Sequence, residues 1–423
     1  MTLNQSFREG RICPYDEHVS PELILLALVV VTALAFDFTN GFHDTANAMA
    51  ASIATKALTP RTAVILCASL NLVGALLSVE VALTVTNAVI NLQSADGSPR
   101  PELLADGGTK LLMILLAGLA GAIIWNLATW LWGLPSSSSH ALFGGLIGAT
   151  MTGLGLGGVK WLGEGGKLDG VVGKVIIPGV MSPAIAMIVA LVGTHFVFRV
   201  AAKLTEKYRT QGFRWGQVGA ASLMSLSHGT NDAQKTMGVI TLALIASGHW
   251  NTTHEVPLWV KLACAFTIAL GTYLGGWRII RTMGKGLVEI EAPQGMSADM
   301  SSASVILASS QLGFALSTTH VATGSILGSG VGRPGAQVRW RVAARMGSAW
   351  LITLPSAAAI GAVMFLIGNS LGAGFGAAAV VLLLGGAGLY MWLHSRKEPI
   401  GHHNVNDEWD DAKKKKSKQE VAV

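Results

Sequence analysis

A series of long, continuous apolar segments limits the fold of this chain more than any other feature of its sequence. They lie at residues 22–55, 62–90, 110–156, 174–198, 217–247, 257–282, 301–331, 346–367 and 371–394. A helix needs about 20 such residues to cross a membrane, whereas a membrane β-barrel shows short alternating segments. Because 51% of the 423 residues are hydrophobic and 13% are charged, we predict an all-α integral membrane protein.

Three smaller features of the sequence give no sign of another class of protein. Cys13, Cys67 and Cys264 are too far apart for a disulfide framework or a metal motif. The GLGLGG stretch at 153–158 follows no predicted strand, which argues against a dinucleotide-binding turn. The net charge of +6 lies mainly in loops and near the C-terminus. We therefore expect the lipid bilayer, and no nucleic acid, as a partner, and no bound cofactor.

The distribution of basic residues predicts the orientation of the chain in the membrane. Residues 199–214 and 333–345 are rich in arginine and lysine, as is the KKKKSK run at 413–418. Cytoplasmic loops carry such an excess. We therefore expect a multi-pass protein of the cell inner membrane, with the N-terminus outside and the C-terminus in the cytoplasm. Segment 301–331 then has cytoplasmic loops on both flanks and is predicted to be a re-entrant hairpin.

Two polar motifs occur twice in the chain. NGFHDTANAM at 40–49 aligns with HGTNDAQKTM at 228–237, and PSSSSHALFGGLIG at 135–148 aligns with LSTTHVATGSILG at 316–328. Either match alone is weak evidence. Because both occur in the same order and at nearly equal spacing, they indicate two homologous halves.

The charge pattern further predicts that the two halves are inverted relative to each other. The first hairpin, 110–156, enters from outside and the second from the cytoplasm, so that their polar tips meet near the middle of the membrane. We therefore predict an inverted-repeat helical bundle with broken helices and two re-entrant hairpins, a layout typical of secondary transporters. The predicted parts are an N-terminal tail (1–21), a first repeat (22–198), a basic cytoplasmic loop (199–216), a second repeat (217–370), a terminal span (371–394) and a cytoplasmic tail (395–423).

Hydroxyl side chains gather at the two predicted hairpin tips. The first tip holds four consecutive serines, Ser136 to Ser139, and the second holds Ser317, Thr318 and Thr319. Hydroxyls together with the free N–H groups at the start of a helix favour an anion. The tips thus suit a tetrahedral oxyanion, which is released more easily where no arginine holds it.

Asp44 and Asp232 would repel that anion unless a cation or a proton lies between them. The anion and the cation then bind best together, and this positive coupling is the physical basis of symport. Phosphate keeps a proton at neutral pH and donates it to a carboxylate, whereas sulfate would leave that acceptor unpaired. We therefore predict symport of inorganic phosphate.

The motifs D-x-x-N-G-x-x-D-x-A-N-A and S-H-G-x-N-D-x-x-K, with P-S-S-S-S-H and S-T-T-H, resemble the inorganic phosphate transporter family, especially its bacterial low-affinity members. The similarity covers residues from about 34 to 366. The resemblance implies phosphate symport, driven by sodium in many members and by protons in the bacterial type, where a neutral metal phosphate is thought to be carried. It also implies an inverted-repeat bundle that forms a homodimer.

The resemblance also assigns roles to individual residues. Asp44 and Asp232 match the essential aspartates of the family, and the flanking polar positions are Asn40, Asn47 and Asn231. The phosphate-binding tips are matched by Ser137, Ser138, Ser139, Ser317, Thr318 and Thr319. Two positions depart from the pattern. Asn71 stands where sodium-coupled members have a glutamate, which favours protons, and Leu316 replaces the usual proline of the second tip.

Several further candidates have alternative roles at this stage. They are Asp37, His43, Ser136, His140, His228, Lys235 and His320. His43 serves either as a proton relay or as a hydrogen-bonding group, and Lys235 pairs either with a carboxylate or with substrate. His140 and His320 either hold the tips in shape or bind a ligand. For the two aspartates, the structural alternative is the capping of interrupted helices.

Other functions compete with phosphate symport. A membrane phosphohydrolase would turn over phosphate esters, but the sequence has no paired metal-ligand motif, so no enzymatic activity is predicted. An anion channel would give flux without coupling to a gradient. Within the same family, a sulfate carrier or a sodium-coupled phosphate symporter is the nearest alternative.

Overall fold

The computed structural model describes residues 20–82, 89–91, 103, 105–163, 169–252, 255–333 and 335–407. Most of the predicted N-terminal tail and the lysine run at 413–418 fall outside these residues. Within them the regular structure is helical, and strand pairing is limited to isolated bridges, such as that between Ile90 and Val159. The prediction of an all-α protein is confirmed.

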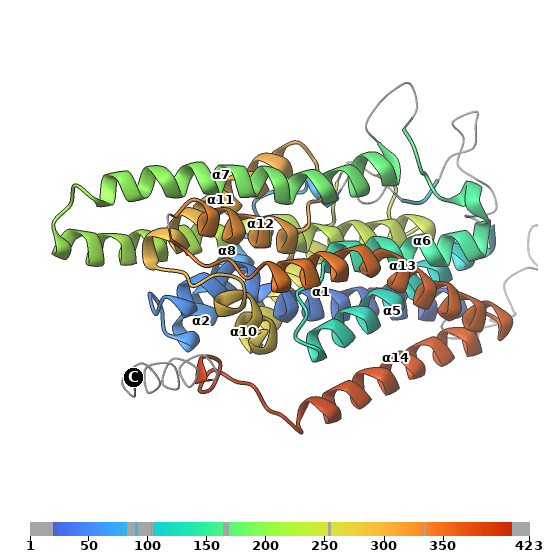
Figure 1. The fold of residues 1–423 in the computed structure, drawn as a ribbon. Coiled ribbons are helices and arrows are strands. Elements are labelled where there is room, and N and C mark those ends of the chain that lie inside the picture. Colours follow the sequence, from blue (N-terminus) through green and yellow to red (C-terminus); the bar gives the residue numbers. More distant parts are fainter. Residues whose placement is uncertain are drawn as a thin grey trace, which may run out of the picture.

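The described α-helices form an elongated bundle (Figure 1). They are α1 (Pro21–Ala54), α2 (Pro60–Ala75), α5 (Thr109–Leu131), α6 (Ser138–Leu154), α7 (Ile177–Ala201), α8 (Glu206–Ala246), α9 (Leu258–Leu274), α10 (Trp277–Gly286), α11 (Ala292–Gln311), α12 (Thr318–Val331), α13 (Trp340–Ser370) and α14 (Ala373–Ser395). Five described spans, α1, α5, α7 with the π-helical turn before it, α13 and α14, are long and apolar enough to cross a membrane. The protein is therefore a multi-pass membrane protein.

The helices that carry the duplicated motifs are continuous. α1 runs for 34 residues through Asp44, and α8 runs for 41 residues through Asp232. Their aspartates therefore do not cap interrupted helices. Breaks are found instead between α9 and α10, which bend by 68°, and at the two hairpin tips.

The basic segment between the two predicted repeats does not mark the ends of the helices. The segment predicted as a basic loop at 199–216 is mostly helical, because α7 continues to Ala201 and α8 begins at Glu206. Lysine, arginine, glutamate and glutamine are good helix formers, so they extend both helices beyond their apolar parts. The two ends project from the bundle at the left of Figure 1.

Two apolar segments also have different boundaries from those predicted. α2 ends at Ala75, although the apolar run continues to residue 90. α11 begins at Ala292, before the predicted start at 301. The prediction missed its first turns because they contain polar residues, such as Gln294 and Asp299, which are nevertheless buried. Hydropathy alone does not reveal a helix whose polar face is covered by its neighbours.

Each predicted hairpin consists of two helices joined by a short non-helical tip. Residues 132–137 join α5 to α6, and residues 312–317 join α11 to α12. Gly133 and Gly313 have φ angles of 62° and 68°, in the left-handed region that glycine adopts without strain. The same device therefore reverses the chain in both halves.

The second limb of each hairpin starts with a serine cap. Ser137 Oγ accepts the backbone N–H of His140 at 3.1 Å, and Ser317 Oγ accepts that of His320 at 3.3 Å. A serine at this position satisfies one of the free N–H groups of the first turn. α6 and α12 thus begin at the serine and threonine clusters, as the sequence predicted.

The two halves exchange helices with each other. α6 packs against α13 of the second half, and α12 packs against α7 of the first half. Gly148 of α6 lies against the carbonyl of Ala358, and its aligned partner Gly328 of α12 lies against the carbonyl of Met187, so neither position has room for a side chain. These matched contacts support two homologous halves, and their inversion across the membrane stays a prediction.

The segment after α14 returns beneath the bundle toward the start of α2 (Figure 1). His402 Nε2 lies 2.7 Å from Arg61 Nη2, and Arg281 Nη2 donates to the carbonyl of Asn404 at 2.7 Å. Val405 is buried. The end of the described chain therefore lies toward the same end of the molecule as the α7–α8 connection.

Candidate functional site

Asp44 lies inside the bundle, among the hydroxyls of both hairpin tips. His43 Nδ1 is 2.6 Å from Asp44 Oδ1, and Ser138 Oγ of the first tip donates to the same oxygen at 3.1 Å. From the second tip, Thr319 Oγ1 donates to Asp44 Oδ1 and Thr318 Oγ1 to Oδ2, each at 3.4 Å. Within the described chain, no lysine or arginine forms an ion pair with this carboxylate.

Asp232 is surrounded by the ammonium group of Lys235, the ring of His228 and the amide of Asn231. Lys235 Nζ lies 2.5 Å from Asp232 Oδ1, and Asn231 Nδ2 donates to the same oxygen at 2.8 Å. His228 Nε2 lies 3.1 Å from Oδ2, although its angle is not that of a hydrogen bond. Lys235 supplies this carboxylate with a fixed positive charge.

Thr318 joins the two carboxylates. Its Oγ1 atom lies 3.1 Å from Asp232 Oδ2 and 3.4 Å from Asp44 Oδ2. The acidic groups of both halves therefore meet at the first residue of α12, where the backbone N–H groups of that helix start. This is the arrangement that the sequence predicted for the second tip.

The flanking asparagines differ in what they contact. Asn47 Nδ2 donates to Thr318 Oγ1 at 3.2 Å and to Thr319 Oγ1 at 3.1 Å. Asn231 Nδ2 donates to the carbonyl of Leu316 at 3.0 Å. Asn40 is buried one turn before Asp44, and the Oδ1 atoms of Asn40 and Asn47 have no hydrogen-bond partner among the described residues.

The first tip is tied to the site through further contacts. Ser136 Oγ lies 2.7 Å from Thr129 Oγ1 and 3.4 Å from His43 Nε2. Ser139 Oγ accepts a hydrogen bond from Lys235 Nζ at 2.6 Å and donates to the carbonyl of Leu316 at 3.3 Å. The structure thus brings together the tips of both halves with the motifs of α1 and α8.

Three predicted candidates lie outside this network in the described structure. The rings of His140 and His320 contact each other edge to face with centroids 4.7 Å apart, and His320 Nδ1 lies 3.0 Å from the carbonyl of Gly179. This is the arrangement expected for residues that hold the tips in shape. Asp37 accepts a hydrogen bond from Thr236 Oγ1 at 3.0 Å, two turns before Asp44 on α1.

Residues of α2, α5 and α9 also support the site, although the sequence did not predict them as site residues. Asn71 Nδ2 donates to Thr272 Oγ1 at 2.8 Å, and Asn71 Oδ1 is 3.2 Å from His228 Nδ1. Thr129 Oγ1 is 3.3 Å from His43 Nε2. An isolated threonine in an apolar helix carries no distinguishing pattern, because such hydroxyls commonly bond to the preceding turn. Only the departure at Asn71 drew attention to its position.

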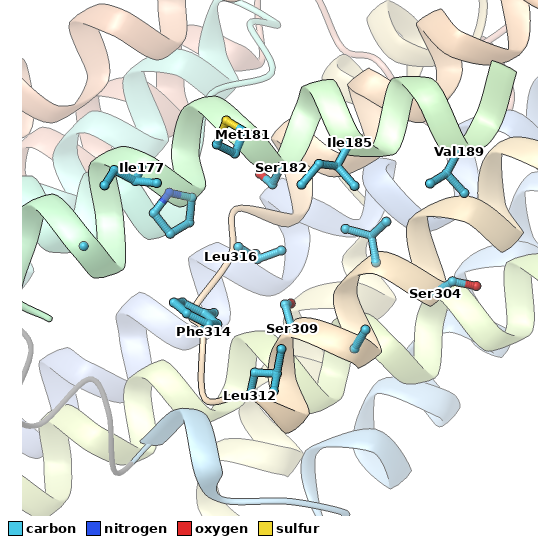
Figure 2. A pocket seen from close by; sticks show the side chains of 14 residues that line it. Ile177, Met181, Ser182, Ile185, Val189, Ser304, Ser309, Leu312, Phe314 and Leu316 are labelled. Atoms are coloured by element: carbon cyan, nitrogen blue, oxygen red, sulfur yellow. The ribbon is translucent and has the colours of Figure 1, made fainter. Parts of the chain in front are cut away.

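Leu316 forms part of the wall between the site and the surface of the bundle. Its carbonyl faces the site, whereas its side chain lines an apolar groove of about 440 Å³ between α7 and the second hairpin (Figure 2). Ile185 and Phe314 line the same groove. The N–H of Leu316 donates to the carbonyl of Phe314 at 3.0 Å, a bond that the family's usual proline lacks.

Asp44, His228 and Asp232 offer one ligand atom each within 4.8 Å of one another. Because an amide oxygen only accepts, the Asn71 contact places the hydrogen of His228 on Nδ1 and leaves Nε2 directed at the carboxylates. A histidine that binds a metal usually has its second nitrogen held in this way. The cluster therefore suits a cation with nitrogen and oxygen ligands.

The comparison with protein families decides which family this architecture represents. A model described as "Phosphate transporter family" matches residues 40–211 and 199–361, which together include both motifs and both tips. The chain belongs to the phosphate transporter family. The resemblance inferred from the motifs is thereby confirmed.

Relatives of this family member share the same description. The chain is 55% identical over 390 residues to a probable low-affinity inorganic phosphate transporter of Mycobacterium tuberculosis, covering 92% of this chain and 88% of the relative. A Bacillus subtilis protein with the same description is 41% identical and is covered over 98% of its length, against 82% of this chain. A solved structure, "The sodium-dependent phosphate transporter", has the same fold, with a TM-score of 0.68 at 21% identity, covering 81% of this chain and 98% of that one.

Proposed function

We propose that this protein is a secondary active symporter of inorganic phosphate. The observation that carries the proposal is the position of Thr318, whose hydroxyl lies between the carboxylates of Asp44 and Asp232. An oxyanion at the two helix starts would meet hydroxyl donors and two acidic groups at once. It is held well only if those acidic groups are neutralised, so binding of the anion and of a cation is coupled. The names of the relatives support phosphate as that anion.

Protons are the coupling ion that the contacts of Asp44 favour. This carboxylate lies 2.6 Å from the imidazole of His43, and imidazole is the side-chain group that most often serves in proton transfer. Asn71 replaces a carboxylate ligand and is bonded to His228 and Thr272. A site poor in fixed oxygen charge binds sodium less well than one with another carboxylate.

A metal phosphate is a second candidate for the carried species. It is supported by the cluster of Asp44, His228 and Asp232, whose ligand atoms lie close enough to share one ion. A divalent cation there would travel with phosphate as cargo. Carboxylate and imidazole ligands together suit several divalent metals, and geometry does not select one of them.

The proposal includes the cell inner membrane and a cytoplasmic C-terminus. It is supported by the basic residues of 199–214 and by the return of the C-terminal segment toward the α7–α8 connection (Figure 1). The homodimer implied by the family resemblance remains a prediction. A cysteine introduced at one of residues 202–205 tests the orientation directly. Its accessibility is measured in intact cells.

The test of the function is uptake of labelled phosphate into liposomes that contain the purified protein. We expect accumulation above equilibrium under an imposed pH gradient, weak competition by sulfate, and loss of accumulation in Asp44→Asn. Asp169→Asn is the matched control, because Asp169 lies on a loop outside the site. Gradient-independent equilibration would indicate a channel, and equal uptake of sulfate would indicate a sulfate carrier.

A further inference from the structure

The duplicated motifs differ at one charged position. When residues 40–49 are aligned with 228–237, Asp44 matches Asp232, and the residue three places later is Asn47 in the first half and Lys235 in the second. Both side chains point into the same site from continuous helices. One half therefore carries a neutral amide where the other carries an ammonium group.

The ammonium group of Lys235 is enclosed by oxygen atoms from three elements. Its Nζ lies 2.5 Å from Asp232 Oδ1 on α8, 2.6 Å from Ser139 Oγ on α6 and 2.9 Å from the carbonyl of Leu316 in the second tip. The side chain is 1% exposed. Since an ammonium group has three hydrogens, these contacts use all of them. A carboxylate, a hydroxyl and a carbonyl are also the ligands that a hard metal cation takes from a protein.

The first half makes one of these contacts, that with the tip hydroxyl, without the charge. Asn47 Nδ2 donates to Thr319 Oγ1 at 3.1 Å, and Thr319 is the residue that aligns with Ser139, the partner of Lys235. The Oδ1 atom of Asn47 is buried and has no partner among the described residues. Both halves thus have a donor to the matching tip hydroxyl. Only in the second half is that donor a cation.

We infer that Lys235 is a tethered cation that permanently occupies the second of two repeat-related cation positions. Only the position at Asp44 then takes up a mobile ion with each substrate. Lys235 is on this view a residue that determines coupling: it sets how many ions move per phosphate and does not bind phosphate itself. The inference rests on the proposed symport function, with the mobile ion at Asp44; a divalent metal shared by Asp44, His228 and Asp232 would have to displace Lys235 from Asp232.

The decisive variant is Lys235→Asn, which gives the second half the residue that the first half already has. A mobile ion should then enter at Asp232, because a buried carboxylate that has lost its fixed cation is strongly unfavourable. Purified Lys235→Asn is expected to gain thermal stability when sodium chloride replaces choline chloride or when the pH is lowered. Wild type should respond less to both. Lys110→Asn, which removes an exposed lysine at the start of α5, is the matched control.

The same variant should change the driving force in liposomes. With the membrane potential held at zero, the steady phosphate accumulation of Lys235→Asn should exceed that of wild type by about tenfold for each tenfold gradient of the additional ion. The sodium and pH gradients are imposed separately to identify that ion. Lys235→Gln, which keeps more of the side-chain volume, is measured in parallel.

Two results would overturn the inference. One is wild-type accumulation in Lys235→Asn together with a melting temperature that follows sodium and pH as in wild type. The other is a failure of both variants to fold even at high sodium or low pH, because a mobile ion should replace the lost ammonium. If wild type itself does not accumulate phosphate, the proposed function fails, and the melting experiment still tests the role of Lys235.

Discussion

Asp44 and Asp232 occupy matching positions in the two halves, yet their negative charges are balanced in different ways. Asp232 has a lysine of its own helix at 2.5 Å. The neighbours of Asp44 are hydroxyls and His43, which is charged only when protonated. The difference teaches that a duplicated site need not use its two copies alike. On the proposal made above, Asp232 is neutralised by Lys235 within the folded structure, and Asp44 is the carboxylate that receives the mobile ion.

The largest difference is expected when each carboxylate is neutralised in turn. Asp232→Asn leaves Lys235 as an unpaired buried charge, which costs about 3 to 5 kcal/mol. Asp44→Asn leaves no fixed cation behind, so its unfolding temperature in detergent should fall much less. The double variant Asp232→Asn with Lys235→Met should recover most of the stability lost. Equal losses for both single variants would remove the proposed asymmetry.

Thr318 contacts both carboxylates, Asp44 and Asp232. Thr318→Val removes the hydroxyl whose single hydrogen lies between the two carboxylates, and a hydrogen bond to a charged group contributes about 1.5 to 3 kcal/mol. We expect phosphate uptake to fall by roughly 10- to 100-fold. Thr318→Ser should retain most of the uptake rate. If the valine variant transports like wild type, Thr318 does not join the carboxylates functionally.

The packing around the two motifs should be equivalent, in contrast to their charges. Gly41 lies against the backbone of Ile268 on α9, and Gly229 lies against that of Asn71 on α2. Alanine at either position overpacks the contact, with an expected cost of roughly 1 to 3 kcal/mol. Gly219→Ala is the control, because no atom lies near the added carbon. Unfolding temperatures that fall in only one half would show that the packing is not duplicated.

The smallest effect is expected for a lysine–aspartate pair at the surface, where the same two residue types as Lys235 and Asp232 are in contact. Lys160 Nζ lies 2.6 Å from Asp169 Oδ2, and both side chains are about a third exposed. Partial burial is the largest influence on Asp169 and raises its pKa, but the hydrogen bonds from Lys160 and the Gly170 N–H, together with the charges of Lys160 and Lys174, outweigh it and lower the net pKa. The pair therefore stabilises at neutral pH and loses that contribution as the pH falls through the folded pKa. Asp169→Asn should cost no more than about 1 kcal/mol at pH 7 by thermal unfolding.

Much of this architecture follows from features that the sequence shows directly. Apolar length predicted the spans, and the repeated motifs predicted that Asp44 and Asp232 would meet the two tips. These predictions succeeded because a buried carboxylate in a membrane helix must have partners, and the two tips supply hydroxyls to it. Family resemblance agreed with phosphate as the substrate, which the protonation argument had favoured over sulfate.

Other parts were beyond sequence reasoning for physical reasons. The bonds of Asn71 to His228 and Thr272 depend on how α2, α8 and α9 pack, and no local pattern encodes that packing. The position of Lys235 among oxygens from three elements depends in the same way on tertiary structure. The continuity of α1 was also hidden, because polar residues in an apolar helix indicate a site whether or not the helix is broken.

The account depends most directly on Asp44 as the carboxylate that receives the mobile ion. Calorimetric titration of purified protein with phosphate, in buffers of different ionisation enthalpy, measures the protons taken up on binding. Wild type is expected to take up about one proton more per phosphate than Asp44→Asn, because binding of the anion and of the proton is coupled. Identical proton uptake by the two proteins would contradict the account.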